Sequence, residues 1–262
     1  MLSTRFVTGS PNWVDLATPS TEEAVAFYGG LFGWQFEPGD PQFGGYGSFT
    51  HDGRQIGGAM GGITEVQPFW SVYFHTSDAE ATVKAVEGAH GNKEFGPDDV
   101  GSLGRMAGFR DASGARFSTW QPLDHKGFGA VNESGSLCWA ELYTPDVPAA
   151  AAFYNAVYGW DIASVPFEGG TYTMASPAGG GEAASFAGIV PLDMDPQAAG
   201  SGPFWLLYFE VDDPDATVAT ARRLGGRIDL EPAYMKGVGR FAKISDPHGA
   251  RFAVIKSDSQ TG

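Results

Sequence analysis

The chain has 262 residues, a formal net charge of −15 and 13% aromatic residues. An acidic surface repels phosphate backbones and anionic lipid headgroups, so we expect neither nucleic-acid nor membrane partners. The sequence has no apolar run long enough to span a bilayer and no secretory-signal pattern at its start. Its one cysteine, Cys138, permits no internal disulfide. We therefore expect a cytoplasmic protein.

The predicted elements of the first half begin with a half-buried strand at 12–17, where Val14 and Leu16 alternate with Trp13 and Asp15. A helix follows, carrying apolar residues at helical spacing and ending near Gly33. The remaining elements of this half are short strands at 46–50 and 55–60, a stronger strand at 70–76, a helix at 79–87, and strands at 105–110 and 116–120.

The second half repeats this pattern at a constant offset. Trp13–Leu16 returns as Trp139–Leu142, and Phe27-Tyr28 returns as Phe153-Tyr154, each 126 positions later (13 to 139). The corresponding elements include an alanine-rich helix through Phe153, strands at 172–175, 184–190 and 205–211, and a helix at 214–224.

The closing part of each copy also repeats, now 135 positions apart (114 to 249): Gly114–Phe117 returns as Gly249–Phe252. A fixed period over so many landmarks indicates a duplicated module. We predict a first module at 1–121, a linker at 122–135 and a second module at 136–262.

These landmarks resemble the vicinal oxygen chelate superfamily, which includes glyoxalases, bleomycin-resistance proteins and extradiol dioxygenases. The resemblance lies in the Phe-Tyr helix ending in Leu31–Trp34 and in the Asp246–Gly249 hairpin before the last strand. It covers Pro11 to Lys256 and is greatest to two-module bacterial proteins of the glyoxalase-like or hydroxylase-like kind. It implies an α+β fold of tandem duplicated modules, each of two βαβββ units curling into a half-open, barrel-like cavity.

The resemblance also implies where a metal would bind. The positions that carry ligands in metal-bearing members fall here on Trp13, Ser71, Ser118, Trp139, Leu206 and Ala253. A divalent ion needs three or four converging nitrogen, oxygen or sulfur donors, which indole and aliphatic groups do not supply. We therefore expect no metal and no other cofactor.

Strand parity predicts which side chains line the cavity in place of metal ligands. Aromatic walls with a few polar groups are typical of a pocket for a small organic molecule. The predicted ligand-binding residues are Trp13, Ser71, Tyr73, Ser118, Trp120, Trp139, Tyr208 and Glu210. The predicted catalytic residues, should a reaction occur, are Asp15, Glu141 and His75.

Each acidic or basic candidate also has a structural interpretation. Asp15 and Glu141 either pair with arginines (Arg105, Arg116, Arg240 or Arg251) or act as a raised-pKa base or as a hydrogen-bond acceptor for a ligand. His75 is either a packing residue or a proton-transfer group. The other histidines, including His125, are expected in loops.

The leading hypothesis is metal-independent binding of a small apolar or aromatic molecule, for sequestration or detoxification. The rival is a glyoxalase-like or hydroxylase-like enzyme, a lyase, isomerase or hydroxylase, that uses the cavity carboxylates as acid and base. A third possibility is a stress or surface-associated protein with a vestigial cavity. Because duplication lets one chain supply both modules, either a monomer or a homodimer is expected.

Overall fold

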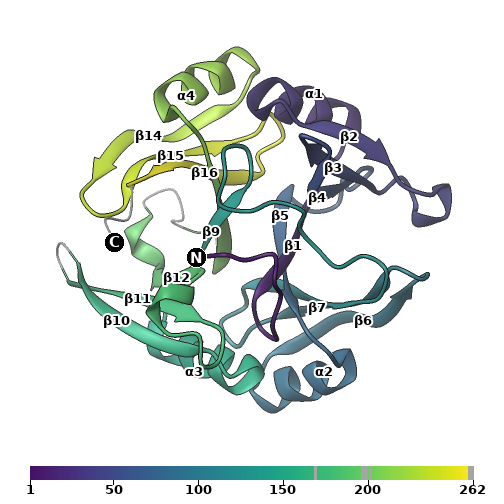
Figure 1. Ribbon diagram of the computed structural model, residues 1–262, viewed down its shortest axis with the longest axis vertical. Helices are drawn as coiled ribbons and strands as arrows, with labels where there is room; N and C mark the ends of the chain where they lie inside the picture. The colour runs from purple at the N-terminus through teal and green to yellow at the C-terminus, as the bar shows by residue number, and fades with distance from the viewer. Residues whose placement is uncertain (168–169, 196–199, 201, 259–262) are drawn as a thin grey trace. The chain divides into compact units, whose positions relative to one another are not determined.

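The computed structural model describes residues 1–167, 170–195, 200 and 202–258 (Figure 1). These residues form sixteen strands and four α-helices. The strands make two eight-stranded sheets, one in the order β2-β3-β4-β1-β5-β8-β7-β6 and the other in the order β10-β11-β12-β9-β13-β16-β15-β14. Within the described residues neither sheet closes on itself. Each repeat thus contains the two βαβββ units that were expected.

The first repeat supplies β1 (Pro11–Ala17), α1 (Thr21–Phe32), β2 (Gln35–Pro38), β3 (Gly47–His51), β4 (Arg54–Met60), β5 (Phe69–His75), α2 (Ala79–Gly88), β6 (Asn92–Val100), β7 (Gly104–Arg110) and β8 (Arg116–Pro122). The second supplies β9 (Leu137–Thr144), α3 (Val147–Tyr158), β10 (Asp161–Phe167), β11 (Gly170–Ser176), β12 (Ala187–Pro191), β13 (Phe204–Glu210), α4 (Pro214–Arg223), β14 (Arg227–Met235), β15 (Gly239–Ser245) and β16 (Arg251–Ser257).

Four strands, β2, β6, β10 and β14, were not among the elements predicted from residue patterns. Their side chains are mostly exposed or half-buried along their length. A strand without a buried face lacks the alternation that marks a strand in sequence. The predicted strand at 184–190 is also shorter than expected, because Glu182–Ala184 forms a 3-10 turn before β12 begins.

The helices begin and end with matching local signals. The Ser20 side chain accepts a hydrogen bond from the Glu23 backbone N–H at the start of α1. Asp146 caps α3 in the same way. Both helices end at a glycine with positive φ, Gly33 at 75° and Gly159 at 71°, where a residue with a Cβ is disfavoured.

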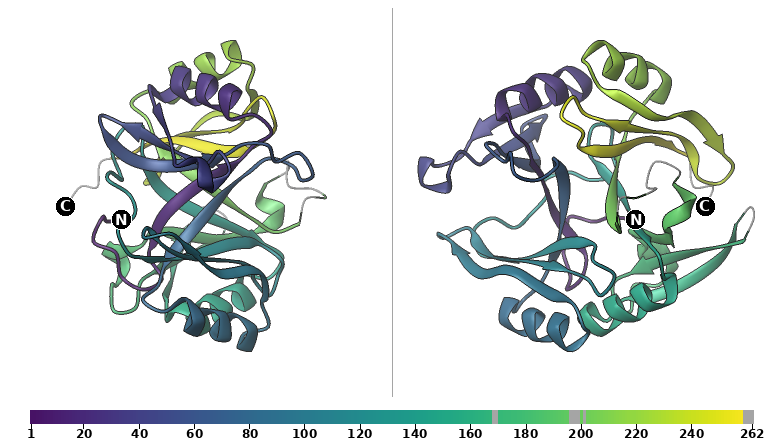
Figure 2. Two further views of the ribbon diagram at one scale, coloured as in Figure 1. Left: turned by 90° about the vertical axis from the view of Figure 1, so that its right-hand side faces the viewer. Right: turned by 180° about the vertical axis from the view of Figure 1, so that it is seen from behind.

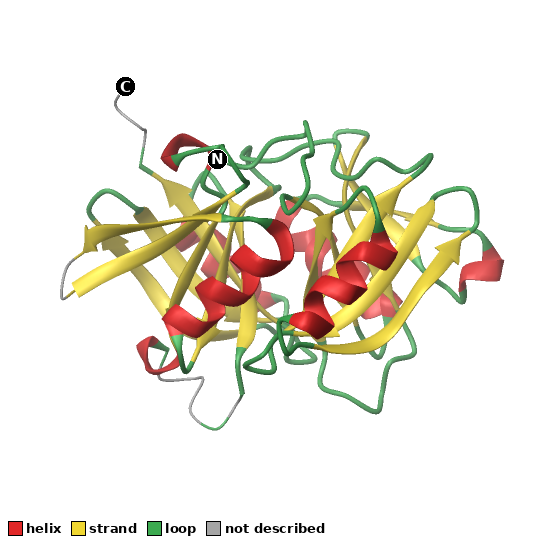
Figure 3. Cartoon of the chain, turned by 90° about the horizontal axis from the view of Figure 1, so that it is seen from below, coloured by secondary structure: helices red, strands yellow, loops and turns green. Residues whose placement is uncertain are grey.

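The chain forms two compact units, and each combines segments from both repeats. Unit 1 consists of Met1–Trp13, Ser71–Gly127 and Trp139–Leu206. Unit 2 consists of Val14–Trp70, Phe128–Cys138 and Leu207–Gly262. In unit 1, α2 packs against α3; in unit 2, α1 packs against α4, and both views of Figure 2 show each helix pair side by side. Figure 3 shows the helices in red and the strands in yellow, with the helices lying against the sheets.

A tyrosine–aspartate hydrogen bond joins the first and last segments of unit 2. The Tyr28 hydroxyl of α1 donates to the Asp246 carboxylate in the β15–β16 turn (3.2 Å), and the Trp70 indole N–H donates to the Tyr28 oxygen (3.0 Å). Burial, followed by the charge of Asp246, raises the pKa of Tyr28 well above its ordinary value. Trp34 stacks on Tyr28 with ring centroids 5.6 Å apart. The "Phe-Tyr" helix and the closing hairpin of the family pattern therefore meet here from opposite repeats.

Unit 1 contains the same arrangement. Tyr154 donates to Asp111 (3.2 Å) and accepts from the Trp205 indole (3.0 Å). The Trp160 ring lies 4.6 Å from Tyr154 and nearly parallel to it. Asp111 also accepts backbone hydrogen bonds from its own tight turn, up to Ala115. The carboxylate therefore holds the hairpin and the helix together.

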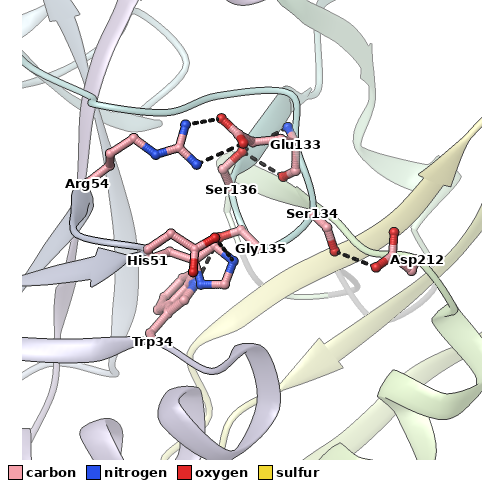
Figure 4. Close-up of polar contacts among 9 residues, drawn as sticks. Trp34, His51, Arg54, Glu133, Ser134, Gly135, Ser136 and Asp212 are labelled. Atoms are coloured by element: carbon pink, nitrogen blue, oxygen red, sulfur yellow. Dashed lines mark hydrogen bonds and ion pairs between the residues drawn. The ribbon is translucent and has the colours of Figure 1, made fainter.

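The segment between the repeats is anchored in unit 2 (Figure 4). The Trp34 indole donates to the Gly135 carbonyl (2.8 Å), and Arg54 makes two hydrogen bonds to Glu133 (2.6 and 2.9 Å). In unit 1 the Trp160 indole likewise donates to the Gly9 carbonyl (2.9 Å). Gly9 and Gly135 have φ near +80°. Among the described residues, no helix is both long and apolar enough to cross a membrane.

Candidate functional site

A buried carboxylate surrounded by aromatic residues lies in unit 1. The Glu141 side chain on β9 accepts hydrogen bonds from the Tyr143 hydroxyl (2.5 Å) and from the Tyr172 hydroxyl of β11 (2.8 Å). The Trp139 indole donates in turn to the Tyr172 oxygen (3.1 Å). The Tyr143 ring stacks on Phe204, with centroids 4.9 Å apart and planes 5° from parallel. We call these five residues the Glu141 cluster.

A glycine on the neighbouring strand makes this cluster possible. Glu141 lies opposite Gly188 of β12 in the parallel β9–β12 pair. A Cβ at Gly188 would lie 1.9 Å from the Tyr172 hydroxyl oxygen, far closer than van der Waals contact allows. The absent side chain therefore leaves the space through which Tyr172 reaches across β12 to the carboxylate.

The electrostatics define the direction of this hydrogen bond. Burial, and then the negative charge of Glu141, raises the pKa of Tyr172 well above its ordinary value. Tyr172 therefore keeps its proton and acts as the donor, while Glu141 is the acceptor. Glu141 is only 8% exposed, so its hydrogen bonds form in a region where water competes little.

Unit 2 contains a related arrangement around Asp15. Asp15 lies opposite Gly58 of β4, and a Cβ at Gly58 would lie 2.0 Å from the Tyr46 hydroxyl oxygen. Tyr46 thus crosses β4 beside Asp15, as Tyr172 crosses β12 beside Glu141. The position of Tyr143 is occupied by Ala17 in the first repeat, so the second tyrosine is particular to the second repeat.

Two predicted tryptophans of unit 1 meet at a histidine assigned to a loop. The His125 ring lies 4.4 Å from Trp13 and 5.7 Å from Trp120, and the His125 carbonyl accepts from the Trp120 indole (2.9 Å). Burial lowers the pKa of His125. Trp13 and Trp120 are thus brought together, and sequence analysis missed His125 because no strand period covers the loop.

His75, at the end of β5 in unit 1, packs against Phe6 with ring centroids 6.4 Å apart. Its Nδ1 atom is buried without a hydrogen-bond partner in the described part of the chain. Burial lowers the pKa of His75. The neutral imidazole is therefore favoured at neutral pH.

The remaining predicted residues lie on their expected strands. Tyr73 is opposite Ser118 in unit 1, and Ser71 is half-buried on the same strand as Tyr73. Tyr208 is opposite Ala253 in unit 2. The Glu210 carboxylate accepts from the backbone N–H (2.9 Å) and hydroxyl (2.7 Å) of Ser257, which ties the end of β13 to β16.

The arginines considered as partners for Asp15 and Glu141 contact other carboxylates. Their ion pairs are Arg105 with Asp99 and Glu80, Arg116 with Glu94, Arg240 with Asp215, and Arg251 with Asp229. Within the residues that the structure describes, these contacts secure β7, β8, β15 and β16.

The donor set does not suit a divalent metal. Two tyrosine hydroxyls occupy the oxygens of Glu141, and Trp139 stands where the family resemblance places a ligand. No group of three or more histidine, cysteine, aspartate or glutamate side chains converges within the described ranges. A protein metal site needs such a convergent set, and the side chains of the described residues do not form one.

This fold of paired βαβββ units defines a known class. The model of the glyoxalase/bleomycin resistance protein/dioxygenase superfamily matches residues 10–119 and 136–254. The chain belongs to this superfamily.

Two kinds of relative resemble the whole chain. The CFP32 protein of Mycobacterium tuberculosis, whose name assigns it provisionally to the glyoxylases, is 37% identical over 258 residues, covering 96% of each chain. The anthracycline biosynthesis protein DauV of Streptomyces sp. (strain C5) is 36% identical over 273 residues, covering 97% of this chain and 95% of DauV.

Among solved structures, the Mn(II)-bound glyoxalase from Novosphingobium aromaticivorans is similar in fold. Its TM-score is 0.63 at 14% sequence identity, covering 97% of this chain and 86% of the glyoxalase. At this identity the likeness concerns the fold alone.

Proposed function

We propose that this protein binds a small aromatic molecule that carries a hydroxyl or amine group, and that it does so without a divalent metal. The Glu141 cluster is the recognition site of this proposal. The observation that carries it is the buried Glu141 carboxylate, oriented by Tyr143 and Tyr172 and bordered by Trp139 and the Tyr143–Phe204 stack.

The chemistry of the cluster suits such a ligand. Each carboxylate oxygen has two lone-pair directions, so a carboxylate can accept hydrogen bonds from several donors at once, a ligand hydroxyl or amine among them. Aromatic side chains offer flat apolar surface for a ring at low entropic cost. The name of DauV refers to anthracycline biosynthesis, and because anthracyclines contain aromatic rings, it supports the same ligand class. A sequestering or detoxifying role is part of the proposal.

The proposal is tested with 2-naphthol, a neutral aromatic hydroxyl donor. Titration should quench tryptophan fluorescence and raise the melting temperature. Glu141→Gln should weaken binding by about ten- to hundredfold, the usual effect of losing a hydrogen bond to a charged group. Glu87→Gln, at an exposed position on α2, is the matched control. If Glu141→Gln and wild type bound 2-naphthol equally, the cluster would not be the recognition site.

A second candidate function is proton transfer. Glu141 as acceptor beside Tyr172, which keeps its own proton, is the arrangement of a general base next to a hydrogen-bond donor. In an isomerase or lyase of this kind, Glu141 would take a proton from a carbon next to a carbonyl. The Tyr172 hydroxyl, whose one proton is donated to Glu141 in the resting protein, would then redirect that hydrogen bond to the developing oxyanion.

The test of this second candidate is exchange of the methyl protons of 2-acetonaphthone in deuterated buffer, followed by NMR at saturating ligand. Wild type should accelerate the exchange and Glu141→Gln should not. An exchange rate equal to that of buffer alone, with 2-naphthol still bound, would leave binding as the function.

A further inference from the structure

One tyrosine of the second repeat is held in unit 1 by contacts of the kind that hold a small ligand. The Tyr143 hydroxyl donates to Glu141 (2.5 Å), and its ring stacks on Phe204 with centroids 4.9 Å apart and planes 5° from parallel. A charge-assisted hydrogen bond and a stacked ring are together the contacts by which a protein recognises a phenol. The side chain of Tyr143 therefore shows which molecule such a carboxylate and ring can hold.

The first repeat has a carboxylate and a ring at the same positions, but it lacks the phenol. Its residues at the positions of Glu141, Phe204 and Tyr143 are Asp15, Phe69 and Ala17. All three belong to unit 2. In both repeats the strands that carry these positions are neighbours in the sheet, β1 beside β5 and β9 beside β13. In unit 2 a methyl group thus takes the place of a phenol.

The burial of these residues agrees with this difference. Glu141 and Tyr143 are buried, at 8% and 3% exposed. Asp15, Ala17 and Phe69 are all half-buried. Solvent therefore reaches the carboxylate and the ring of unit 2 at the level of the sheet where the side chain of Tyr143 covers Glu141 in unit 1.

We infer that Asp15, Ala17 and Phe69 form a second binding site, which takes a monocyclic phenol. The hydroxyl of this ligand donates to the Asp15 carboxylate, and its ring stacks on Phe69. The difference between an alanine and a tyrosine side chain is the volume of one phenol, so the site selects a single ring over the bicyclic 2-naphthol.

Other contacts of Asp15 are compatible with this site. Glu141 accepts the hydroxyls of Tyr143 and Tyr172 at the same time, as the lone pairs of a carboxylate allow. Tyr46 crosses β4 beside Asp15 in the manner of Tyr172. The ligand hydroxyl therefore adds to this arrangement, in the role that Tyr143 has in unit 1, and displaces no side chain.

The experiment compares 4-methylphenol, which is a tyrosine side chain without its backbone, with toluene, which lacks the hydroxyl. Both are titrated by ligand-observed NMR into the Glu141→Gln protein, so that the Glu141 cluster contributes little. This protein should bind 4-methylphenol about tenfold more tightly than toluene, the usual effect of a hydrogen bond to a charged group. Adding Asp15→Asn should remove most of this preference.

Ala17→Tyr provides the decisive variant, because it supplies from the chain the ring that the ligand would bring. It should abolish binding of 4-methylphenol in the Glu141→Gln protein. Ala219→Tyr adds the same side chain at an exposed position on α4 and should leave binding unchanged.

Equal affinity for the two ligands, or no binding of either, would overturn the inference. So would an Ala17→Tyr variant that melts as its parent does and still binds 4-methylphenol. If Ala17→Tyr does not fold, the loss of preference in Asp15→Asn carries the same test. The outcome is separable from the proposed function, because 2-naphthol reports on Glu141 and should bind Ala17→Tyr, made in the wild-type chain, as it binds wild type.

Discussion

The buried cores of the two units repeat the same contacts, whereas the sheet faces that carry the candidate sites do not. Trp70–Tyr28–Asp246 in unit 2 and Trp205–Tyr154–Asp111 in unit 1 have matching hydrogen-bond lengths. On the faces, Tyr143 replaces Ala17 and Glu210 replaces His75.

The difference follows from packing. A close-packed core with internal hydrogen bonds tolerates few changes, because each leaves a cavity or an unpaired polar atom. A side chain that faces away from the helices changes mainly its own surroundings. The duplicated scaffold can therefore remain the same while its two faces acquire different chemistry.

Whether the two cores contribute equally to stability is tested by removing one buried indole ring from each. Trp34→Ala and Trp160→Ala each delete a stacked ring and a hydrogen bond to a glycine carbonyl. Each should lower the free energy of unfolding by about 3–5 kcal/mol, as large-to-small core substitutions do. Urea denaturation measures both. Losses that differ by more than about 2 kcal/mol would show that the matching contacts are not equivalent in energy.

The difference between the faces is tested at the two strand glycines. Gly58→Ala and Gly188→Ala each place a Cβ within about 2 Å of a tyrosine hydroxyl, and overpacking should cost each variant about 1–3 kcal/mol. Gly188→Ala should also weaken 2-naphthol binding, because Tyr172 is displaced from Glu141, whereas Gly58→Ala should not.

Gly88→Ala is the control for these variants, since a Cβ there meets nothing within 4 Å. It should leave both stability and binding close to wild type. Equal loss of binding in Gly58→Ala and Gly188→Ala would mean that the two carboxylate sites act alike.

A smaller effect on stability is expected from the two buried histidines of unit 1, His75 and His125, when the pH is lowered. Burial lowers the pKa of His125 and of His75 below the ordinary value of 6.5. As pH falls below 6.5 the unfolded chain therefore binds protons that the folded chain does not, and stability decreases. His125→Gln should flatten the fall in melting temperature between pH 7 and pH 5.

His90, which is exposed, provides the comparison for this experiment. Asn tolerates the positive φ of His90, so His90→Asn should leave the pH profile unchanged. A profile that His125→Gln also leaves unchanged would assign the pH dependence to other groups.

Much of the fold could be predicted because its signals are local or periodic. The constant offset revealed the duplication, and Gly33 marked the end of α1. The strands β2, β6, β10 and β14 could not be predicted, since they have no buried face to impose alternation. The repeat period also could not show that Tyr28 of the first repeat donates a hydrogen bond to Asp246 of the second. Which residues pair between repeats depends on tertiary packing.

Only part of the candidate site could be predicted from the sequence. Strand parity predicted Trp139 and Glu141 as cavity residues, and in the structure both contact Tyr172. The part played by Tyr172 was missed, because it depends on the register of three strands and on the missing side chain of Gly188. Ala17 was missed for a similar reason: only the contacts of Tyr143 in the other repeat show what a side chain at this position can cover.

Each unit is built from segments that lie far apart in the sequence, which affects how the protein folds during synthesis on the ribosome. Unit 2 requires Val14–Trp70 together with Leu207–Gly262, so its first segment emerges long before its last. The residues of α1 that contact α4 and Phe252 therefore stay exposed until most of this sequence has been translated. Contacts so distant along the chain slow folding, and a nascent chain of this kind is a natural client for chaperones.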